Sequence, residues 1–338
     1  MKLLVTGGAG FIGSSFVRMA LGEGWAEKVV NVDKLTYAGN LDNLQPIAGH
    51  PGYRFVQLDI CDAPAIEELF RLEGPDAVVH FAAESHVDRS IHSPAPVILT
   101  NFNGTFSLLE AARRNKIARF VHVSTDEVYG SIDPPHDADE TYPVRASSPY
   151  SASKAGSDLL ALSYFTTYKL NVSVTRASNN YGPYQFPEKL IPLMISNALD
   201  DVPLPVYGDG QQVRDWLYVE DHCRAIQTVL EKGDPGEIYN IGGNCSLPNL
   251  EVVHRILRAT GKPESLIRRV TDRPGHDRRY ALTNQKLTTK TGWEPRMDFE
   301  QGLQKTVDWY KTNQDWVRRV KTGEYREFYE LNYATRQA

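Results

Sequence analysis

Cysteine is scarce in this sequence: the chain has three among 338 residues, Cys61, Cys223 and Cys245, none at the spacing of metal ligands. This scarcity excludes a disulfide-rich framework, and it predicts reduced cysteines in a cytoplasmic protein with no bound metal. Long apolar runs are missing as well. No stretch approaches the roughly 18 residues of a membrane span, and the apolar start breaks at Gly7 and Gly8, so we expect neither a membrane segment nor a signal peptide.

A large excess of charge of one sign is also absent. The chain carries 37 Lys and Arg against 42 Asp and Glu, a formal net charge of -5. This balance gives no sign of a general nucleic-acid binder, so an anionic ligand must meet a local cluster of basic side chains. The remaining composition, 41% hydrophobic and 23% charged, is that of a globular protein with one large or two closely joined domains.

The first half of the sequence alternates between two patterns. Strand-length apolar runs lie at 2–6, 28–33, 53–59, 77–81, 119–124 and 172–177, and segments of helical period lie at 11–21, 63–72, 97–115 and 150–170. This alternation predicts an α/β fold with a doubly wound parallel sheet. After about residue 178 prolines interrupt the pattern, but 216–230 and 237–241 look again like strand and helix of the first domain. We therefore expect one domain from 1–178 plus about 214–241, and a smaller, mostly C-terminal α/β substrate-binding domain from about 179–213 and 242–338.

A glycine-rich turn follows the first expected strand. The residues from Gly8 to Gly13 fit the pattern G-x-G-x-x-G, open an expected helix, and are followed 20 residues later by Asp33 at the end of another strand. Glycines in this place let the backbone approach a pyrophosphate at the helix N-terminus. A carboxylate at Asp33 suits the ribose hydroxyls and repels a 2′-phosphate, which favours NAD over NADP. The strand ends at Asp59-Ile60 and Phe81-Ala82-Ala83 lie where such a sheet meets the adenosine.

Tyr150 and Lys154 are four residues apart at the start of an expected helix, so their side chains share one face. A free phenol has a pKa near ~10 and must lose about three units to act as a base near neutrality, a cost of about 4 kcal/mol. An ammonium group at ~4 Å supplies a comparable amount at an effective dielectric constant of ~20, and a bound nicotinamide cation adds to it. The spacing is common on helix surfaces, and it indicates a catalytic pair here because it follows a dinucleotide motif.

These residues resemble the extended short-chain dehydrogenase/reductase family. Within that family, the chain is similar to the dTDP-glucose 4,6-dehydratases from residue 1 to about 320, through the segments 35–40, 82–90, 124–130, 179–183 and 272–277. The resemblance implies a Rossmann-type domain with a tightly bound NAD that is regenerated in each turnover. It also implies the cofactor contacts, which are Gly7, Gly10, Phe11, Ile12, Gly13, Asp33, Lys34, Leu35, Thr36, Asp59, Ile60, Phe81, Ala82, Ala83, Ser85, Thr100, Tyr150, Lys154 and Asn180.

The adjacent carboxyls Asp126 and Glu127 distinguish the dehydratases from their relatives. They follow the strand at 119–124, at the end where open α/β sheets bind ligands. A dehydration needs a separate acid and base, whereas a 4-epimerisation needs neither. The resemblance implies that Tyr150, paired with Lys154, deprotonates the sugar C4 hydroxyl while Thr125 orients it. Glu127 then takes the C5 proton, and a protonated Asp126 gives its proton to the leaving C6 hydroxyl.

The resemblance also implies the contacts to a nucleotide-sugar. Two arginines, Arg214 and Arg273, suit the diphosphate because a guanidinium donates hydrogen bonds in a planar fork, and Tyr207 offers a stacking face for the base. The full set is Ser85, Thr125, Asn179, Lys189, Leu190, Pro205, Tyr207, Arg214, Asn249, Arg273, His276 and Tyr280. The loop from Cys245 to Pro248 replaces a more polar one, which leaves the choice of thymidine over uridine open.

Three alternatives remain at this stage. A UDP- or GDP-sugar dehydratase differs little from a dTDP-sugar enzyme, and an epimerase or decarboxylase of the same fold is disfavoured by Asp126. A regulator that binds the cofactor without chemistry is disfavoured by the intact catalytic residues. The resemblance further implies a homodimer, in which the helices at 97–115 and 150–170 form a four-helix bundle with their counterparts, although burial within one chain explains their apolar content equally well.

Overall fold

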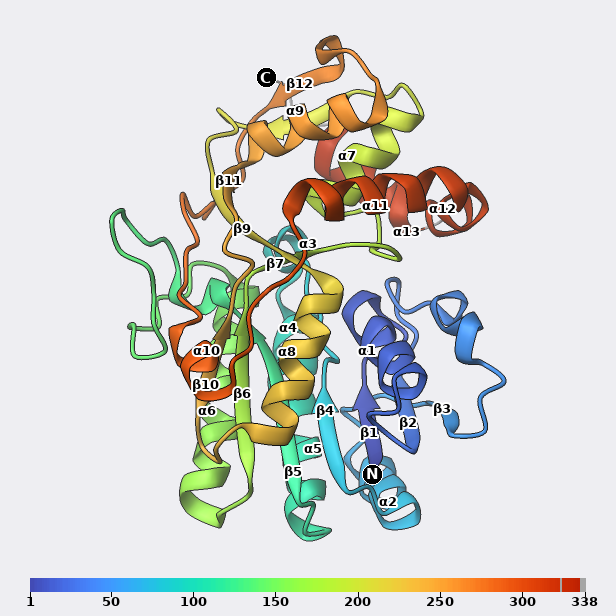
Figure 1. Ribbon diagram of the computed structural model, residues 1–338, viewed down its shortest axis with the longest axis vertical. Coiled ribbons are helices and arrows are strands. Elements are labelled where there is room, and N and C mark those ends of the chain that lie inside the picture. Colours follow the sequence, from blue (N-terminus) through green and yellow to red (C-terminus); the bar gives the residue numbers. More distant parts are fainter. Residues whose placement is uncertain (323, 335–338) are drawn as a thin grey trace.

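The computed structural model describes residues 1–322 and 324–334, which fold into two units (Figure 1). A large parallel sheet with helices on both faces occupies the lower part of the view, and a smaller α/β unit lies above the carboxyl ends of its strands. Among the described residues, no helix combines the length and the apolar character that crossing a membrane requires.

Seven parallel strands make up the large sheet, in the order β10-β6-β5-β4-β1-β2-β3. The chain runs from β1 outward to β3 and then crosses to the other side of β1, so β1 and β4 flank the point where the strand order reverses. In open α/β sheets this switch point opens a crevice for ligands. The strands are β1 (Lys2–Thr6), β2 (Lys28–Asp33), β3 (Tyr53–Gln57), β4 (Ala77–His80), β5 (Arg119–Thr125), β6 (Val172–Ala177) and β10 (Ile238–Ile241).

Helices bury both faces of this sheet, so β1, β4 and β6 are buried along nearly their whole length. On one face α1 (Phe11–Gly22) and α8 (Val219–Lys232) pack over Leu3, Val5 and Val79. On the other face α2 (Ala63–Glu73), α5 (Thr105–Arg114) and α6 (Pro149–Tyr168) enclose a second apolar core. The fold expected from the sequence is therefore confirmed.

The helix expected at 97–115 is not uniform. It begins as α4 (Ala95–Ile98), passes through a π-helical turn at Leu99–Gly104 and continues as α5. The wider turn faces Asn101 inward, where its amide donates to the Glu84 carbonyl at 3.0 Å and to the Ser153 hydroxyl at 2.8 Å. These polar bonds stabilise a local departure from α-geometry beside the cavity, the usual setting of such turns.

The smaller unit is built around a third apolar core. It holds a three-stranded sheet, a parallel strand pair and a set of helices. Its strands are β7 (Asn179–Tyr181), β8 (Leu204–Tyr207), β9 (Val213–Tyr218), β11 (Ser246–Pro248) and β12 (Ile267–Val270). Its main helices are α7 (Leu190–Leu199), α9 (Asn249–Thr260), α11 (Phe299–Thr312), α12 (Gln314–Val320) and α13 (Glu324–Tyr329), the last continued by a π-helical turn at Glu330–Ala334.

The expected domain boundaries differ from the structure at two places. The strand β9 pairs with β7 and β11 and not with the large sheet, so the return to the first unit begins with α8 and continues with β10. The helix α10 (Gln285–Thr291) lies against β10, and Leu287 and Trp293 join the core under α1 and α8. Both differences arise because strand partners and buried faces are chosen in three dimensions. The assignment of the two units to NAD and to the nucleotide-sugar stays a prediction.

Candidate active site

A cavity of about 410 Å³ lies at the switch point of the large sheet and extends under the smaller unit. It gathers residues at or just after the carboxyl ends of β1 to β5, from α6, and from the smaller unit's β8, β9 and α9. Its walls include every site residue expected from the sequence except Leu35. Leu35 turns away because its backbone adopts a positive φ of 58°, and its side chain packs against the core beneath α1.

The glycine loop forms one end of the cavity. Gly7 has a φ of +71°, and a Cβ there would meet the Ala82 nitrogen at 2.6 Å; at Gly13 a Cβ would meet the Gly7 carbonyl oxygen at 2.2 Å. These contacts bring the loop, β4 and α1 together more closely than a side chain allows. No side chain of the described residues caps the N-terminus of α1, so its N–H groups stay available to a phosphate.

Asp33 ties this loop to the end of β2. Its carboxylate accepts hydrogen bonds from the Ala9 nitrogen at 2.9 Å and the Leu35 nitrogen at 2.8 Å, and it lines the cavity. Lys34 forms an ion pair with Asp59 at 2.6 Å at the same edge. A glycine cradle that excludes side chains, an uncapped helix N-terminus and an acidic side chain at the next strand end together fit a dinucleotide without a 2′-phosphate.

The Tyr150 and Lys154 pair lies at the start of α6. A capping box between Ser148 and Ser151 fixes the helix N-terminus, and the Lys154 ammonium donates to the Val123 carbonyl at 2.8 Å. Burial lowers the pKa of Lys154 to about 8. Burial and the charge of Glu127 raise the pKa of Tyr150, against a hydrogen bond with Thr125. Among the described residues burial therefore outweighs Lys154, whose ammonium keeps its charge while it donates to this carbonyl. The lowered phenol pKa that the sequence predicts from Lys154 together with a bound nicotinamide cation stays a prediction.

The second catalytic group begins where β5 ends. Thr125 is the last residue of the strand, and its hydroxyl accepts from the Glu127 nitrogen at 3.2 Å and donates to Asp126 at 3.3 Å. Asp126 is 3% exposed, and its Oδ2 has no hydrogen-bond partner among the described residues. Burial, then the neighbouring charges of Glu127 and Asp215, raise the pKa of Asp126 well above its ordinary value. Burial and the neighbouring charges therefore favour the protonated form of Asp126 beside the half-buried Glu127, and an acid next to a base is what the dehydration chemistry requires.

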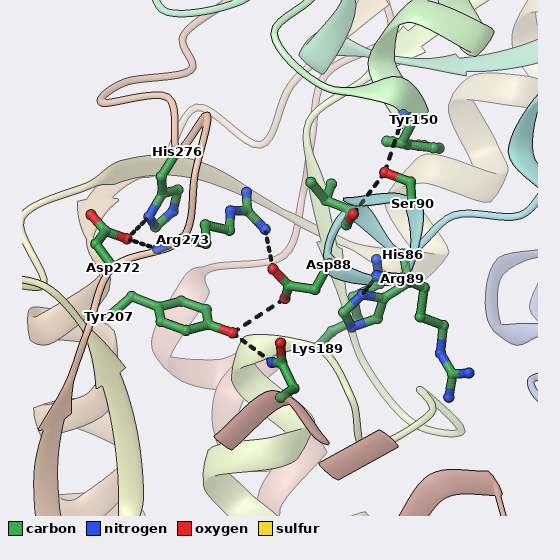
Figure 2. A network of polar contacts seen from close by, with 12 residues as sticks. His86, Asp88, Arg89, Ser90, Tyr150, Lys189, Tyr207, Asp272, Arg273 and His276 are labelled. Carbon is green, nitrogen blue, oxygen red and sulfur yellow. Dashed lines mark hydrogen bonds and ion pairs between the residues drawn. The ribbon is translucent and has the colours of Figure 1, made fainter. Parts of the chain in front are cut away.

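The opposite end of the cavity is basic and aromatic (Figure 2). Arg214 is held by the Asp277 carbonyl at 2.9 Å, with its guanidinium 4.1 Å from the centre of the Tyr280 ring. Arg273 lies 3.7 Å from Asp88, and Figure 2 shows Asp88 between Arg273 and Tyr207. This end therefore has the cations and the flat ring that a nucleoside diphosphate needs.

Several buried polar atoms at the cavity are left for a ligand. Asn179 Oδ1, Asn249 Oδ1 and Arg273 Nε have no hydrogen-bond partner among the described residues. Orphaned polar atoms are costly in a folded protein unless a ligand or water satisfies them. His276 bonds Asp272 at 2.6 Å, and burial together with Arg273 lowers its pKa to about 4, so it is neutral near the phosphate site.

Sequence reasoning missed some cavity residues. These include Asp88, Glu188, His222 and Tyr333. Asp88 lies within the segment 82–90 that carried the family resemblance, and Glu188 directly precedes Lys189, so both had a nearby signal. Tyr333 had none, because it lies beyond the region of resemblance. No cluster of three or more His, Cys, Asp or Glu side chains suited to a metal was found in the described part of the chain.

Comparison with known proteins identifies the family. The family model described as GDP-mannose 4,6 dehydratase matches residues 4–306. A dTDP-glucose 4,6-dehydratase of Xanthomonas campestris pv. campestris is 55% identical, with 96% of this chain and 97% of that protein covered, and one of Shigella flexneri is 51% identical over the full length of both.

Solved structures agree. DesIV, a dTDP-glucose 4,6-dehydratase from Streptomyces venezuelae crystallised with NAD and TYD bound, superposes with a TM-score of 0.93 at 51% identity, covering 95% of this chain and 100% of that one. The chain belongs to the dTDP-glucose 4,6-dehydratase family of the extended short-chain dehydrogenases/reductases.

Proposed function

We propose that this protein is an NAD-dependent hydro-lyase, a dTDP-glucose 4,6-dehydratase that converts dTDP-glucose to dTDP-4-keto-6-deoxyglucose and water. The observation that carries the proposal is the buried Asp126, whose pKa is raised, beside Glu127 in the same cavity as Tyr150 and Lys154. An acid and a base held next to a proton-abstracting tyrosine are the groups needed to remove water from a hexose after its oxidation.

The residues divide the reaction among themselves. NAD, which the glycine loop and Asp33 would hold, would supply a hydride acceptor for C4 and the same hydride for C6, so there is no net oxidation. Tyr150 removes the proton of the C4 hydroxyl, and Thr125 donates a hydrogen bond to the C4 oxygen. Glu127 removes the C5 proton, which the adjacent ketone has made acidic, and Asp126 protonates the departing C6 hydroxyl. Glu127 then returns a proton to C5.

The nucleotide end is held by charge and by the unsatisfied polar atoms. Arg214 and Arg273 bind the diphosphate, and Asn249 contacts the nucleotide. Asn179 contacts the sugar. Tyr207 offers its ring to the base. Lys189, directly before α7, donates to the Ser85 carbonyl at 2.6 Å, which joins the smaller unit to the segment after β4.

The decisive experiment compares three nucleotide-sugars. The purified protein, with no NAD added, is incubated separately with dTDP-glucose, UDP-glucose and GDP-mannose, and the products are examined by NMR for a new C6 methyl group and a C4 ketone. We expect the methyl signal with dTDP-glucose at the highest kcat/KM. A product epimerised at C4 and lacking the methyl would contradict the dehydratase assignment, and a preference for UDP-glucose or GDP-mannose would contradict the assigned nucleotide.

We also propose that two chains associate through the helices at 95–114 and 149–168. Apolar side chains stay exposed on them, including Leu99 at 54%, Phe106 at 47% and Leu159 at 61% exposure. A patch of this kind marks an interface more often than open solvent. Leu159→Glu is expected to yield monomers in size-exclusion chromatography with light scattering. Leu72→Glu, at a similarly exposed leucine on α2, is the control and leaves the dimer intact. A cytoplasmic location stays a prediction from the cysteine usage.

A further inference from the structure

The end of the described chain folds back onto the cavity. Tyr325, Tyr329 and Tyr333 follow one another at intervals of four residues, and their rings form a row with centroid spacings of 6.1 Å and 5.0 Å. The side chain of Tyr333 is the last in this row and lines the cavity beside Tyr207. The helix α13 and the turn after it therefore bring an aromatic ring to the site from the far end of the sequence.

The contact between this segment and Tyr207 is specific. The rings of Tyr207 and Tyr333 are stacked, 5.9 Å apart and inclined by 24°. The Asn332 amide, which is fully buried, donates to the Tyr207 hydroxyl at 2.7 Å. The same hydroxyl donates to Asp88 at 3.3 Å, and Asp88 faces Arg273 at 3.7 Å. Because a phenol has one proton to give, accepting from Asn332 leaves that proton for Asp88.

A second set of contacts holds the segment in place. The Arg89 guanidinium lies 4.3 Å from the centre of the Phe328 ring and 3.8 Å from the centre of the Tyr37 ring. The Phe328 ring also meets His86 edge-on at 5.0 Å. The Tyr329 hydroxyl accepts from Asn197 of α7 at 3.2 Å. These anchors on three other segments make the C-terminal turn a wall of the cavity.

We propose that this C-terminal segment is part of the nucleotide site, with Tyr333 contacting the base beside Tyr207 and Asn332 acting as a positioning residue through the Tyr207 hydroxyl. The inference deepens the proposed function and rests on it. An aromatic pair at the mouth of a diphosphate site offers flat faces to a planar base, and such stacking is sequence-tolerant but strong. Asn332 sets the ring orientation of Tyr207 and, through Asp88, the position of Arg273.

The test measures binding apart from turnover. In the full-length, NAD-loaded protein, the Kd for dTDP is determined by calorimetry, and KM and kcat are determined with dTDP-glucose. For Tyr333→Ala we expect Kd and KM to rise about tenfold, within the usual range for loss of a base stack, with kcat changed less than about twofold. Tyr333→Phe restores wild-type values. Glu330→Gln, an exposed position in the same turn, is the matched control and changes neither. Where the alanine variant loses NAD or unfolds, Tyr333→Leu replaces it.

The role of Asn332 is tested by a double-mutant cycle with Tyr207→Phe. If Asn332 acts through the hydroxyl, Asn332→Leu raises KM in the wild-type background and has no further effect in Tyr207→Phe. Additive losses would overturn that role. A fall in Kd for Tyr333→Ala would overturn the proposal, because the ring would then occupy the place of the base, and so would unchanged binding. A wild-type protein that fails to bind dTDP refutes the proposed function instead.

Discussion

Replacing Asp126 with asparagine should stop the reaction between its two halves. Asp126 is 3% exposed, and burial and its acidic neighbours raise its pKa, which favours the protonated acid. An asparagine matches the shape of the protonated carboxyl but has no proton to give. Loss of a general acid costs about 10²- to 10⁴-fold in rate, which is about 3–5 kcal/mol in activation free energy, so kcat for the keto product should fall by that factor. The first step, oxidation at C4, does not use Asp126.

The assay is a single turnover with dTDP-glucose. The near-ultraviolet absorbance of reduced nicotinamide is followed alongside NMR detection of the C6 methyl group. The variant should reduce its bound NAD at a rate close to that of the wild type, and the reduced form should persist because elimination is slow. Tyr150→Phe is the control, and it should show no reduction. If Asp126→Asn also fails to reduce NAD while keeping the wild-type melting temperature, Asp126 serves the oxidation and our assignment is wrong.

The same residue sets a pH dependence. An acid with a raised pKa keeps its proton to a higher pH than usual and loses it as the pH rises through that pKa, so the elimination rate of the wild type should fall on the alkaline side of that pKa. The Asp126→Asn variant, already slow, lacks this alkaline decline in its elimination step. A stopped-flow pH series on both proteins measures the difference. An identical alkaline decline in the variant would show that another group causes it.

Three further predictions concern other parts of the site. Gly13→Ala places a Cβ 2.2 Å from a loop carbonyl oxygen and should lower the NAD content of the purified protein. The control is Gly22→Ala, which has no atom within 4 Å of the new Cβ and should keep its NAD. Equal NAD content in the two variants would contradict the role of the glycine loop in binding NAD. Burial lowers the pKa of Lys154 from 10.5 to about 8, so the folded protein binds fewer protons than the unfolded chain between these pH values. Lys154→Met should therefore raise the free energy of unfolding by about 3 kcal/mol near pH 7, and this gain should vanish by pH 10.5. A gain that does not depend on pH in urea titrations would contradict this. Asp158→Asn leaves the buried Arg176, now 2.9 Å from its partner, uncompensated and should lower the free energy of unfolding by about 3–5 kcal/mol, and a loss below 1 kcal/mol would refute the reasoning.

The dinucleotide end of the site was predictable because its signals are local. A strand, a glycine turn and a helix N-terminus follow one another within 20 residues, and the backbone geometry of that unit is nearly independent of the rest of the chain. Leu35 has a positive φ of 58° and its side chain packs against the core, so its expected contact with the cofactor stays a prediction. Counting residues after a strand does not reveal such a reversal.

For the acidic pair Asp126 and Glu127, the sequence predicted the position but not the protonation state. Its position at the end of β5 was readable, since strand ends of a parallel sheet share one edge. Its protonation state was not, because the pKa of Asp126 depends on burial and on Asp215, which reaches it from β9 in the other unit. The environment of Tyr150 was not readable either: spacing placed Tyr150 and Lys154 on one face, but only the fold shows that the ammonium bonds a backbone carbonyl and that burial raises the pKa of the phenol.

The sequence by itself determined the parallel sheet, the glycine cradle, the acidic pair and the family, because each is written in short segments whose local conformation follows from residue type and spacing. Tertiary structure alone decided which side chains meet: β9 with β7, Asp88 with Arg273, and Tyr333 with Tyr207. Such contacts join segments far apart in the chain. They depend on which surfaces are buried together, and burial is also what sets the charge of the groups that do the chemistry.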